Sequence, residues 1–111
     1  MIRFELPIVV STNKFYESKH WTFRNKIKNQ YRDVAFTGEI ITEYPVDCHY
    51  TFYIANNFDT SNLSIMQKLI EDCLVKKGIL KNDSPKYVNR ISIGRVKSKE
   101  SYCEIKIEKA N

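Results

Sequence analysis

The sequence predicts an α/β fold of the α+β kind: a four-stranded mixed sheet with two helices packed on one face. The chain has 111 residues, which suits one compact domain with one hydrophobic core. Segments in which apolar and polar residues alternate, as in strands, are interleaved with two segments of helical period. The resulting order, β-α-β-α-β-β, favours a sheet layered with helices. We therefore expect residues 1–111 to form a single domain, without linkers or internal repeats.

The first half of the chain predicts two strands around one helix. Apolar and charged residues alternate over residues 2–6, and Pro7 then ends this short strand. From Phe23 the apolar residues recur at helical spacing and the opposite side is basic, so we expect an amphipathic helix that ends near Gly38. Residues 46–54 show the clearest alternation in the chain, which predicts a central strand.

The second half predicts one helix followed by two strands. Apolar residues recur at three and four residues from about Asn62 to Lys77, and Gly78 has the place of a helix-ending glycine. Two β segments follow, at residues 87–96 and 102–107. The short polar stretch between them, residues 97–100, is typical of a hairpin connection.

The cysteine content and the lengths of the apolar segments exclude several classes of protein. The chain has three widely spaced cysteines and no C-x-x-C pair. We therefore expect these cysteines to be small, buried hydrophobic residues and not parts of a disulfide framework or a zinc ribbon. No apolar run approaches the ~20 residues that span a bilayer, and the first ten residues lack the pattern of a signal peptide. We therefore expect a cytoplasmic protein that does not contact a membrane.

The net charge of +5 is concentrated near the N-terminus. Aromatic residues are interleaved there with basic ones, a mixture that neutralises phosphates and stacks on exposed bases. The alternative is a solvated helix face, and the spacing of Phe23 and Tyr31 favours packing in the core. The candidate nucleic-acid-binding residues are Lys14, Lys19, Arg24, Lys26, Lys28 and Arg32.

Two aspartates follow predicted elements at places that suit either structure or chemistry. Asp59 lies in the loop before the second helix, where its plain interpretation is a cap for free backbone amides. Asp83 lies in Asn82-Asp83-Ser84-Pro85, which on its own predicts a turn.

Taken together, these segments resemble the RusA-type Holliday-junction resolvase family. The resemblance rests on Asp59-Thr-Ser-Asn62, Lys68-x-x-x-Asp72-x-Leu74 and Gly78-Ile-Leu with Asn82-Asp83-Ser84, in the order of the family motifs D-x-D-N, K-x-x-x-D-x-L and G-v-x-x-D-D-S. The N-terminal Ser11-Thr-Asn-Lys14 and His20-Trp-x-x-Arg24 are also similar to the start of such proteins. The resemblance covers most of the chain.

The resemblance implies a homodimeric, Mg²⁺-dependent endonuclease, with Mn²⁺ as a possible substitute, that nicks four-way DNA junctions symmetrically in recombination or repair. By position, Asp59 and Asp83 correspond to metal carboxylates and Lys68 to the family's lysine, so these three are the candidate catalytic residues. Ser61 and Asn82 stand where the family has further aspartates. This difference leaves open a non-catalytic protein that binds junctions or duplex DNA, or a structural protein that touches no DNA.

The reach of the chain limits how these residues can meet. With a helical rise of ~1.5 Å per residue, Asp59 and Asp72 should lie ~15 Å or more apart, so they cannot share an ion. Lys68 and Asp72 are spaced i,i+4 and predict a surface ion pair. Asp83 can approach Asp59 only if the segment from Gly78 runs back along the helix, or if it comes from the other subunit of a dimer.

Overall fold

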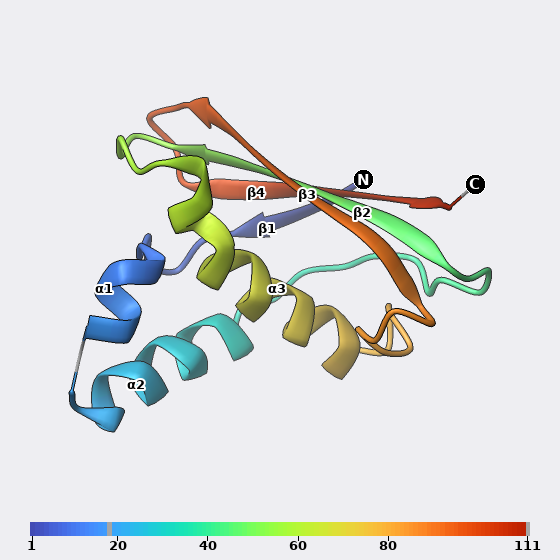
Figure 1. The fold of residues 1–111 in the computed structure, drawn as a ribbon, viewed down its shortest axis with the longest axis horizontal. Coiled ribbons are helices and arrows are strands. Elements are labelled where there is room, and N and C mark those ends of the chain that lie inside the picture. Colours follow the sequence, from blue (N-terminus) through green and yellow to red (C-terminus); the bar gives the residue numbers. More distant parts are fainter. Residues whose placement is uncertain (18, 111) are drawn as a thin grey trace.

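The sheet has four strands in the order β1-β4-β2-β3, and the helices cover one of its faces (Figure 1). The computed structural model describes residues 1–17 and 19–110. Strand β2 pairs in parallel with β3 and antiparallel with β4, and β4 pairs antiparallel with β1, so the mixed α+β sheet predicted from the sequence is confirmed. The elements in chain order are β1 (Ile2–Glu5), α1 (Thr12–Glu17), α2 (Trp21–Arg32), β2 (Val46–Ile54), the 3₁₀ helix η1 (Thr60–Leu63), α3 (Ser64–Lys76), β3 (Val88–Lys97) and β4 (Tyr102–Lys109).

The predicted hairpin between the last two strands is wrong. Strand β2 lies between β3 and β4, so the short connection after Lys97 passes the end of β2 instead of joining neighbours. The backbone N–H of Ser98 donates to the carbonyl oxygen of Ile54, the last residue of β2, at 3.0 Å. The parallel pairing of β2 and β3 explains this arrangement, because a parallel partner has to be reached by a crossover and α3 provides it.

The helical region before β2 differs from the prediction at both of its ends. A short additional helix, α1, precedes α2, and α2 already ends at Arg32 rather than near Gly38. Gly38 instead lies in the loop that follows, where a Cβ atom would come within 2.9 Å of the Ile2 side chain and 3.1 Å of the Ile79 side chain. The glycine therefore permits a close approach of this loop to the core.

The core lies between β2 and α3, the two elements with the strongest sequence patterns. Alternate residues of β2, from Val46 to Ile54, are at most 2% exposed. The predicted apolar stripe of the second helix is buried over its whole length, from Leu63 to Leu74. The three cysteines are free and buried, as expected from the sequence. None of the helices in the described part of the chain is long and apolar enough to cross a membrane.

Gly78 ends α3 as predicted, with a left-handed backbone (φ 79°). The N–H of Gly78 donates to the carbonyl of Val75, and the N–H of Ile79 donates to the carbonyl of Leu74, each at 3.0 Å. These two bonds form a Schellman motif, which satisfies carbonyls that the end of a helix would leave unpaired. The motif also reverses the chain and directs it towards Asp83.

Replacing this glycine should destabilise the protein through the backbone alone. A Cβ atom at position 78 would meet nothing within 4 Å, so Gly78→Ala is expected to lower the free energy of unfolding by about 1–2 kcal/mol because of its left-handed φ. Gly94→Ala is the matched control, since its Cβ atom also meets nothing and its φ is not positive. Urea denaturation followed by circular dichroism measures both variants. Equal stability of the two would contradict the role assigned to the φ angle.

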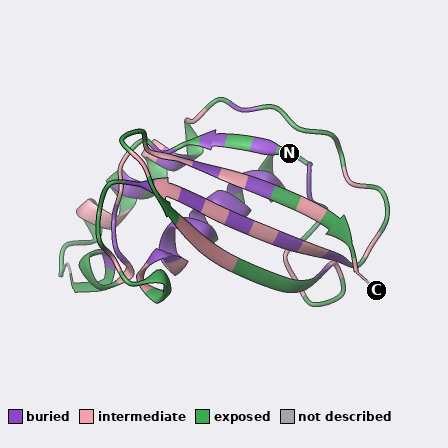
Figure 2. Ribbon diagram, turned by 90° about the horizontal axis from the view of Figure 1, so that it is seen from above, coloured by how far each residue is buried: buried purple, intermediate pink, exposed green. Residues whose placement is uncertain are grey.

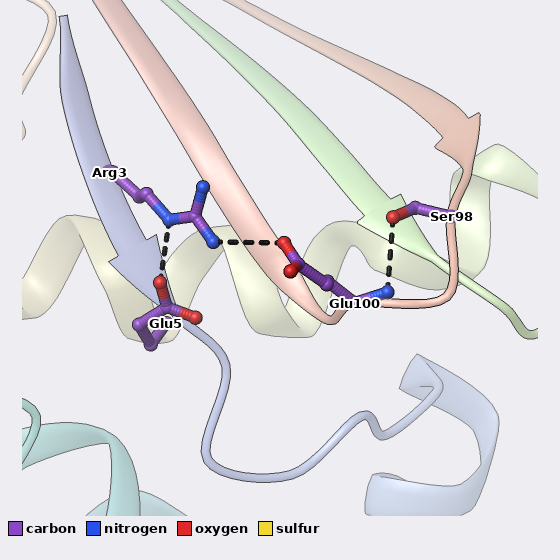
Figure 3. Close-up of polar contacts among 4 residues, drawn as sticks. All are labelled: Arg3, Glu5, Ser98 and Glu100. Carbon is purple, nitrogen blue, oxygen red and sulfur yellow. Dashed lines mark hydrogen bonds and ion pairs between the residues drawn. The ribbon is translucent and has the colours of Figure 1, made fainter.

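Along β1 and β2, intermediate and exposed residues alternate with buried ones (Figure 2). The more exposed set, which faces away from the helices, consists of Arg3, Glu5, Asp47, His49, Thr51 and Tyr53, so this face of the sheet is mainly polar. Arg3 bonds Glu5 at 2.6 Å and Glu100 at 3.2 Å (Figure 3). Its guanidinium also lies 3.7 Å from the centre of the Tyr102 ring, which stacks on Tyr53. Acidic and basic groups thus neutralise one another on this face, and the excess positive charge of the chain resides mainly on the helices.

Candidate functional site

Lys68 of α3 is the centre of a charged cluster. Its Nζ atom lies 2.5 Å from Oδ2 of Asp83 and 3.2 Å from Oδ1 of Asp72. The ammonium group lowers the pKa of Asp83, and the hydrogen bond to that carboxylate raises the pKa of Lys68. Asp83 is therefore ionised at neutral pH. The predicted i,i+4 pair of Lys68 and Asp72 is confirmed, and Asp83 joins it from fifteen residues further along the chain.

The segment after α3 runs back beside the helix to bring Asp83 to this position. Lys68 lies eight residues before the end of α3, a distance of about 12 Å along the axis. A turn is present, but it lies slightly later than the predicted residues 82–85. The N–H of Ser84 donates to Oδ1 of Asn82, and the N–H groups of Tyr87 and Val88 donate to the Ser84 carbonyl, so the hydrogen-bonded turn begins at Ser84. The turn holds Asp83 between the helix and the start of β3.

A buried carboxylate, which the sequence did not indicate, lies beside this cluster. Glu71 of α3 is 3% exposed, and its Oε1 atom accepts a hydrogen bond of 3.1 Å from the hydroxyl of Tyr50 on β2. Burial raises the pKa of Glu71, with Lys68 acting in the opposite direction and Asp83 in the same one. The sequence feature that could have predicted this burial is the position of Gln67 and Glu71 within the apolar stripe of the helix. Both side chains are buried.

The raised pKa of Glu71 predicts how stability depends on pH. Because the folded state binds this proton more tightly than the unfolded chain, the contribution is fully present below the unfolded pKa of about 4.3. It is lost as pH rises through the higher folded value. Glu71→Gln keeps an acceptor for Tyr50 and removes the charge. We expect this variant to lose less stability between pH 4 and pH 8 than the wild type does.

Urea midpoints at the two pH values measure this effect. Glu43→Gln is the control, because that carboxylate is 71% exposed. Parallel pH profiles for Glu71→Gln and the wild type would contradict the assignment.

Asp59 immediately precedes η1, and among the described residues Lys68 forms ion pairs with Asp72 and Asp83 but not with Asp59. The prediction that its side chain caps the helix is wrong, because only its backbone carbonyl is used, as acceptor for the N–H of Asn62 at 2.8 Å. Thr12 caps α3 instead: its Oγ1 accepts from the N–H of Ile65 at 3.1 Å and lies 2.9 Å from Oγ of Ser64. The exposed carboxylate of Asp59 thus does not cap the N-terminus of a helix.

The structure therefore unites two of the three candidate catalytic residues. Lys68 and Asp83 are in contact. Asp59 instead immediately precedes η1, the short helix that leads into α3. Over residues 1–17 and 19–110, no group of three or more His, Cys, Asp or Glu side chains could hold a metal ion. Asp59 and Asp83 stay candidate ligands by position in the sequence.

The predicted basic residues lie on α1, on α2 and in the connection between them. Five of the six are exposed, whereas Arg24 is half-buried and its Nε atom is buried without a hydrogen-bond partner within the described chain. Tyr31 is 1% exposed and Phe23 is partly buried against the core, as predicted. A groove of about 230 Å³ separates α2 from α3; it is lined by Lys28, Asn29, Arg32, Leu69, Asp72, Cys73 and Lys76. The basic face of α2 thus adjoins the Lys68 cluster through Asp72.

Comparison of the chain with models of protein families, with curated protein sequences and with solved structures found no match.

Proposed function

We propose that this protein is a Mg²⁺-dependent, structure-selective endodeoxyribonuclease that resolves four-way DNA junctions by paired nicks. The observation that carries the proposal is the contact between Lys68 and Asp83, at 2.5 Å. These residues are fifteen positions apart in the chain, and each was singled out by its place in a motif similar to those of the RusA-type family. Their convergence on one surface supports a common chemical role.

The chemistry of the available side chains suits a hard cation. Mg²⁺ takes oxygen ligands, commonly one or two carboxylates with waters and substrate phosphate oxygens. Asp83 is ionised and partly exposed, and Asp59 is exposed. In the proposal these two carboxylates hold the ion, either within one subunit or across a dimer. The bound ion would supply a hydroxide nucleophile and offset charge on the phosphate.

The remaining residues of the proposed site bind and orient the DNA. Lys68 is positioned to exchange its contact with a carboxylate for one with a phosphate oxygen, because its side chain is half exposed. The basic faces of α1 and α2 neutralise phosphates of the junction arms without reading sequence. Asp72 stays a surface partner of Lys68.

Paired nicks need two active sites, and we therefore propose a two-fold homodimer. The face of the sheet away from the helices is largely polar, so the apolar residues at the edge strand β3 are the better candidates for the contact. Ile91 is 41% exposed and Val96 is 44% exposed. A protein that resolves DNA junctions would act in the cytoplasm of a bacterial or phage-infected cell.

One assay tests the nuclease directly. The protein is incubated with an end-labelled mobile four-way junction, with and without Mg²⁺, and the products are separated on a denaturing gel. We expect paired nicks that require the ion and that disappear in Asp59→Asn, while Glu43→Gln cleaves like the wild type. Absence of nicks with the wild type at every Mg²⁺ and Mn²⁺ concentration would refute the enzyme.

A junction-binding protein without catalysis is the second candidate. Two observations favour it: Ser61 and Asn82 replace carboxylates of the similar family, and Asp83 already has an ammonium partner. It predicts a salt-dependent shift of the junction in a native gel with no cleaved product. A protein that touches no DNA would give neither a shift nor a product.

A further inference from the structure

Helices α1 and α2 border an open surface hollow of about 630 Å³ on the side of the molecule that carries the basic residues. It is lined by Lys14, Glu17, His20, Thr22, Phe23 and Lys26. The partly buried ring of Phe23 gives it an apolar wall. The hollow is thus bounded by an aromatic side chain and two exposed lysines.

Two large aromatic side chains next to the lining residues in the chain are exposed to solvent instead of being packed in the core. Trp21, between the lining residues His20 and Thr22, is 70% exposed, and Tyr16 on α1 is 60% exposed. Burying a side chain of this size is strongly favourable, and the neighbouring Phe15 is only 2% exposed. Both side chains belong to residues adjacent in the chain to those that line the hollow, which makes them candidates for contacts with whatever occupies it.

The charge around these aromatic side chains indicates which kind of partner fits. Lys14, Lys19 and Lys26 are exposed in this region, against the single acidic residue Glu17. A partner that combines flat aromatic surface with negative charge matches both features, and a nucleotide of DNA has a base and a phosphate. A base inside a duplex is stacked on its neighbours, so the matching form is an unpaired nucleotide.

We propose that the hollow between α1 and α2, with Trp21, binds an unpaired nucleotide of branched or single-stranded DNA. The base in the hollow lies against Phe23, the adjoining base stacks on Trp21, and Lys14 and Lys26 contact the flanking phosphates. In a mobile four-way junction such nucleotides are exposed when base pairs at the crossover open during branch migration, so the biological source of the ligand rests on the proposed function. Binding itself needs no catalysis.

Trp21 is the only tryptophan of the chain, so its fluorescence reports this site directly. Excitation at a wavelength that tyrosine does not absorb isolates its signal. A ten-residue oligothymidylate is expected to quench the fluorescence, and the quenching should weaken as salt is raised. An abasic oligonucleotide of the same length and charge should leave the fluorescence nearly unchanged, because it offers phosphates but no base.

Variants separate stacking from general attraction between charges. Trp21→Ala should weaken binding of a dye-labelled oligothymidylate by about tenfold or more in fluorescence anisotropy, and Trp21→Phe should recover part of the loss. Lys26→Ala should weaken binding and reduce the salt dependence. Lys106→Ala, on β4, is the control and should bind like the wild type. Circular dichroism confirms that each variant is folded.

The outcomes distinguish this inference from the proposed nuclease. Equal quenching by the abasic oligonucleotide, or wild-type affinity of Trp21→Ala, would overturn the nucleotide site even if the junction is cleaved. Base-dependent quenching without cleavage of any junction would support the site and refute the enzyme. Quenching by heparin as strong as by oligothymidylate would show a general polyanion surface and would also overturn the inference.

Discussion

Asp83→Asn is expected to reduce the rate of junction cleavage by at least about 100-fold, as the loss of an essential metal-binding carboxylate does. The amide has the same shape as the carboxylate, so the turn that follows it, which begins at Ser84, should persist. It lacks the negative charge that pairs with Lys68 at 2.5 Å and that would bind a cation. DNA binding should be unchanged or stronger, because one negative charge is removed from the surface that, in the proposed function, contacts the phosphates. A denaturing gel measures cleavage, and a native gel measures binding.

Asp72→Asn is the matched control for this variant within the same cluster. Asp72 also contacts Lys68, at 3.2 Å, but its side chain is 55% exposed and it lies one helical turn along the same surface. An exposed i,i+4 pair contributes only about 0.3–0.5 kcal/mol, so we expect cleavage within about threefold of the wild type. Equal losses in Asp72→Asn and Asp83→Asn would show that the cluster acts only through its net charge. Full activity of Asp83→Asn would remove Asp83 from the active site.

Lys68→Ala tests the other partner of the pair. Removal of the ammonium group should lower both cleavage and junction affinity, since in the proposal Lys68 contacts a phosphate. Lys106→Ala, on the polar face of the sheet, should alter neither. A Lys68→Ala protein with lower stability but unchanged catalysis would reduce the contact with Asp83 to a structural ion pair.

The sequence predicted the fold well where its periodic patterns were long. Strand β2 and helix α3 were correctly placed because their periodic patterns extend over nine and thirteen residues. The pairing of β3 was not predictable in this way, since a short connection fits a hairpin equally well and the true neighbour, β2, lies more than forty positions earlier for paired residues such as His49 and Ser92. Helix α1 is only six residues long, too short for a clear periodic pattern. The residue that could have predicted its start is Ser11, whose Oγ accepts a hydrogen bond from the N–H of Lys14.

The contacts of the candidate site also differ in how far the sequence predicted them. The contact of Lys68 with Asp72 follows from helical spacing. The contact of Lys68 with Asp83 does not, because the sequence left open whether the segment after Gly78 runs back along α3. The burial of Glu71 was indicated by its place within the apolar stripe of α3, but its pairing with Tyr50 could not be predicted, because it depends on how α3 packs across β2. Asp59 shows the opposite case: its residue type and position predict a cap, but Thr12 from another helix occupies that role.

Tyr31→Ala is expected to have the largest effect on stability, lowering the free energy of unfolding by about 3–5 kcal/mol, as for other buried aromatic side chains. Tyr31 is 1% exposed, its ring stacks on Phe4 at 5.8 Å, and its hydroxyl donates to the carbonyl of Ile8 at 2.7 Å. It thereby attaches α2 to the sheet. Tyr31→Phe keeps the ring and loses one hydrogen bond, so its cost should be about 1 kcal/mol.

The two variants also test whether the basic helix must be docked for DNA to bind. Urea denaturation gives their stabilities, and junction binding is measured at a temperature where both remain folded by circular dichroism. Because Tyr31 holds the helix that carries Lys28 and Arg32 beside α3, Tyr31→Ala should bind the junction more weakly than Tyr31→Phe. Equal affinity of the two folded variants would mean that the charges of α2 act without a fixed position, and a loss of stability below about 1 kcal/mol in Tyr31→Ala would contradict the role of the ring in the core.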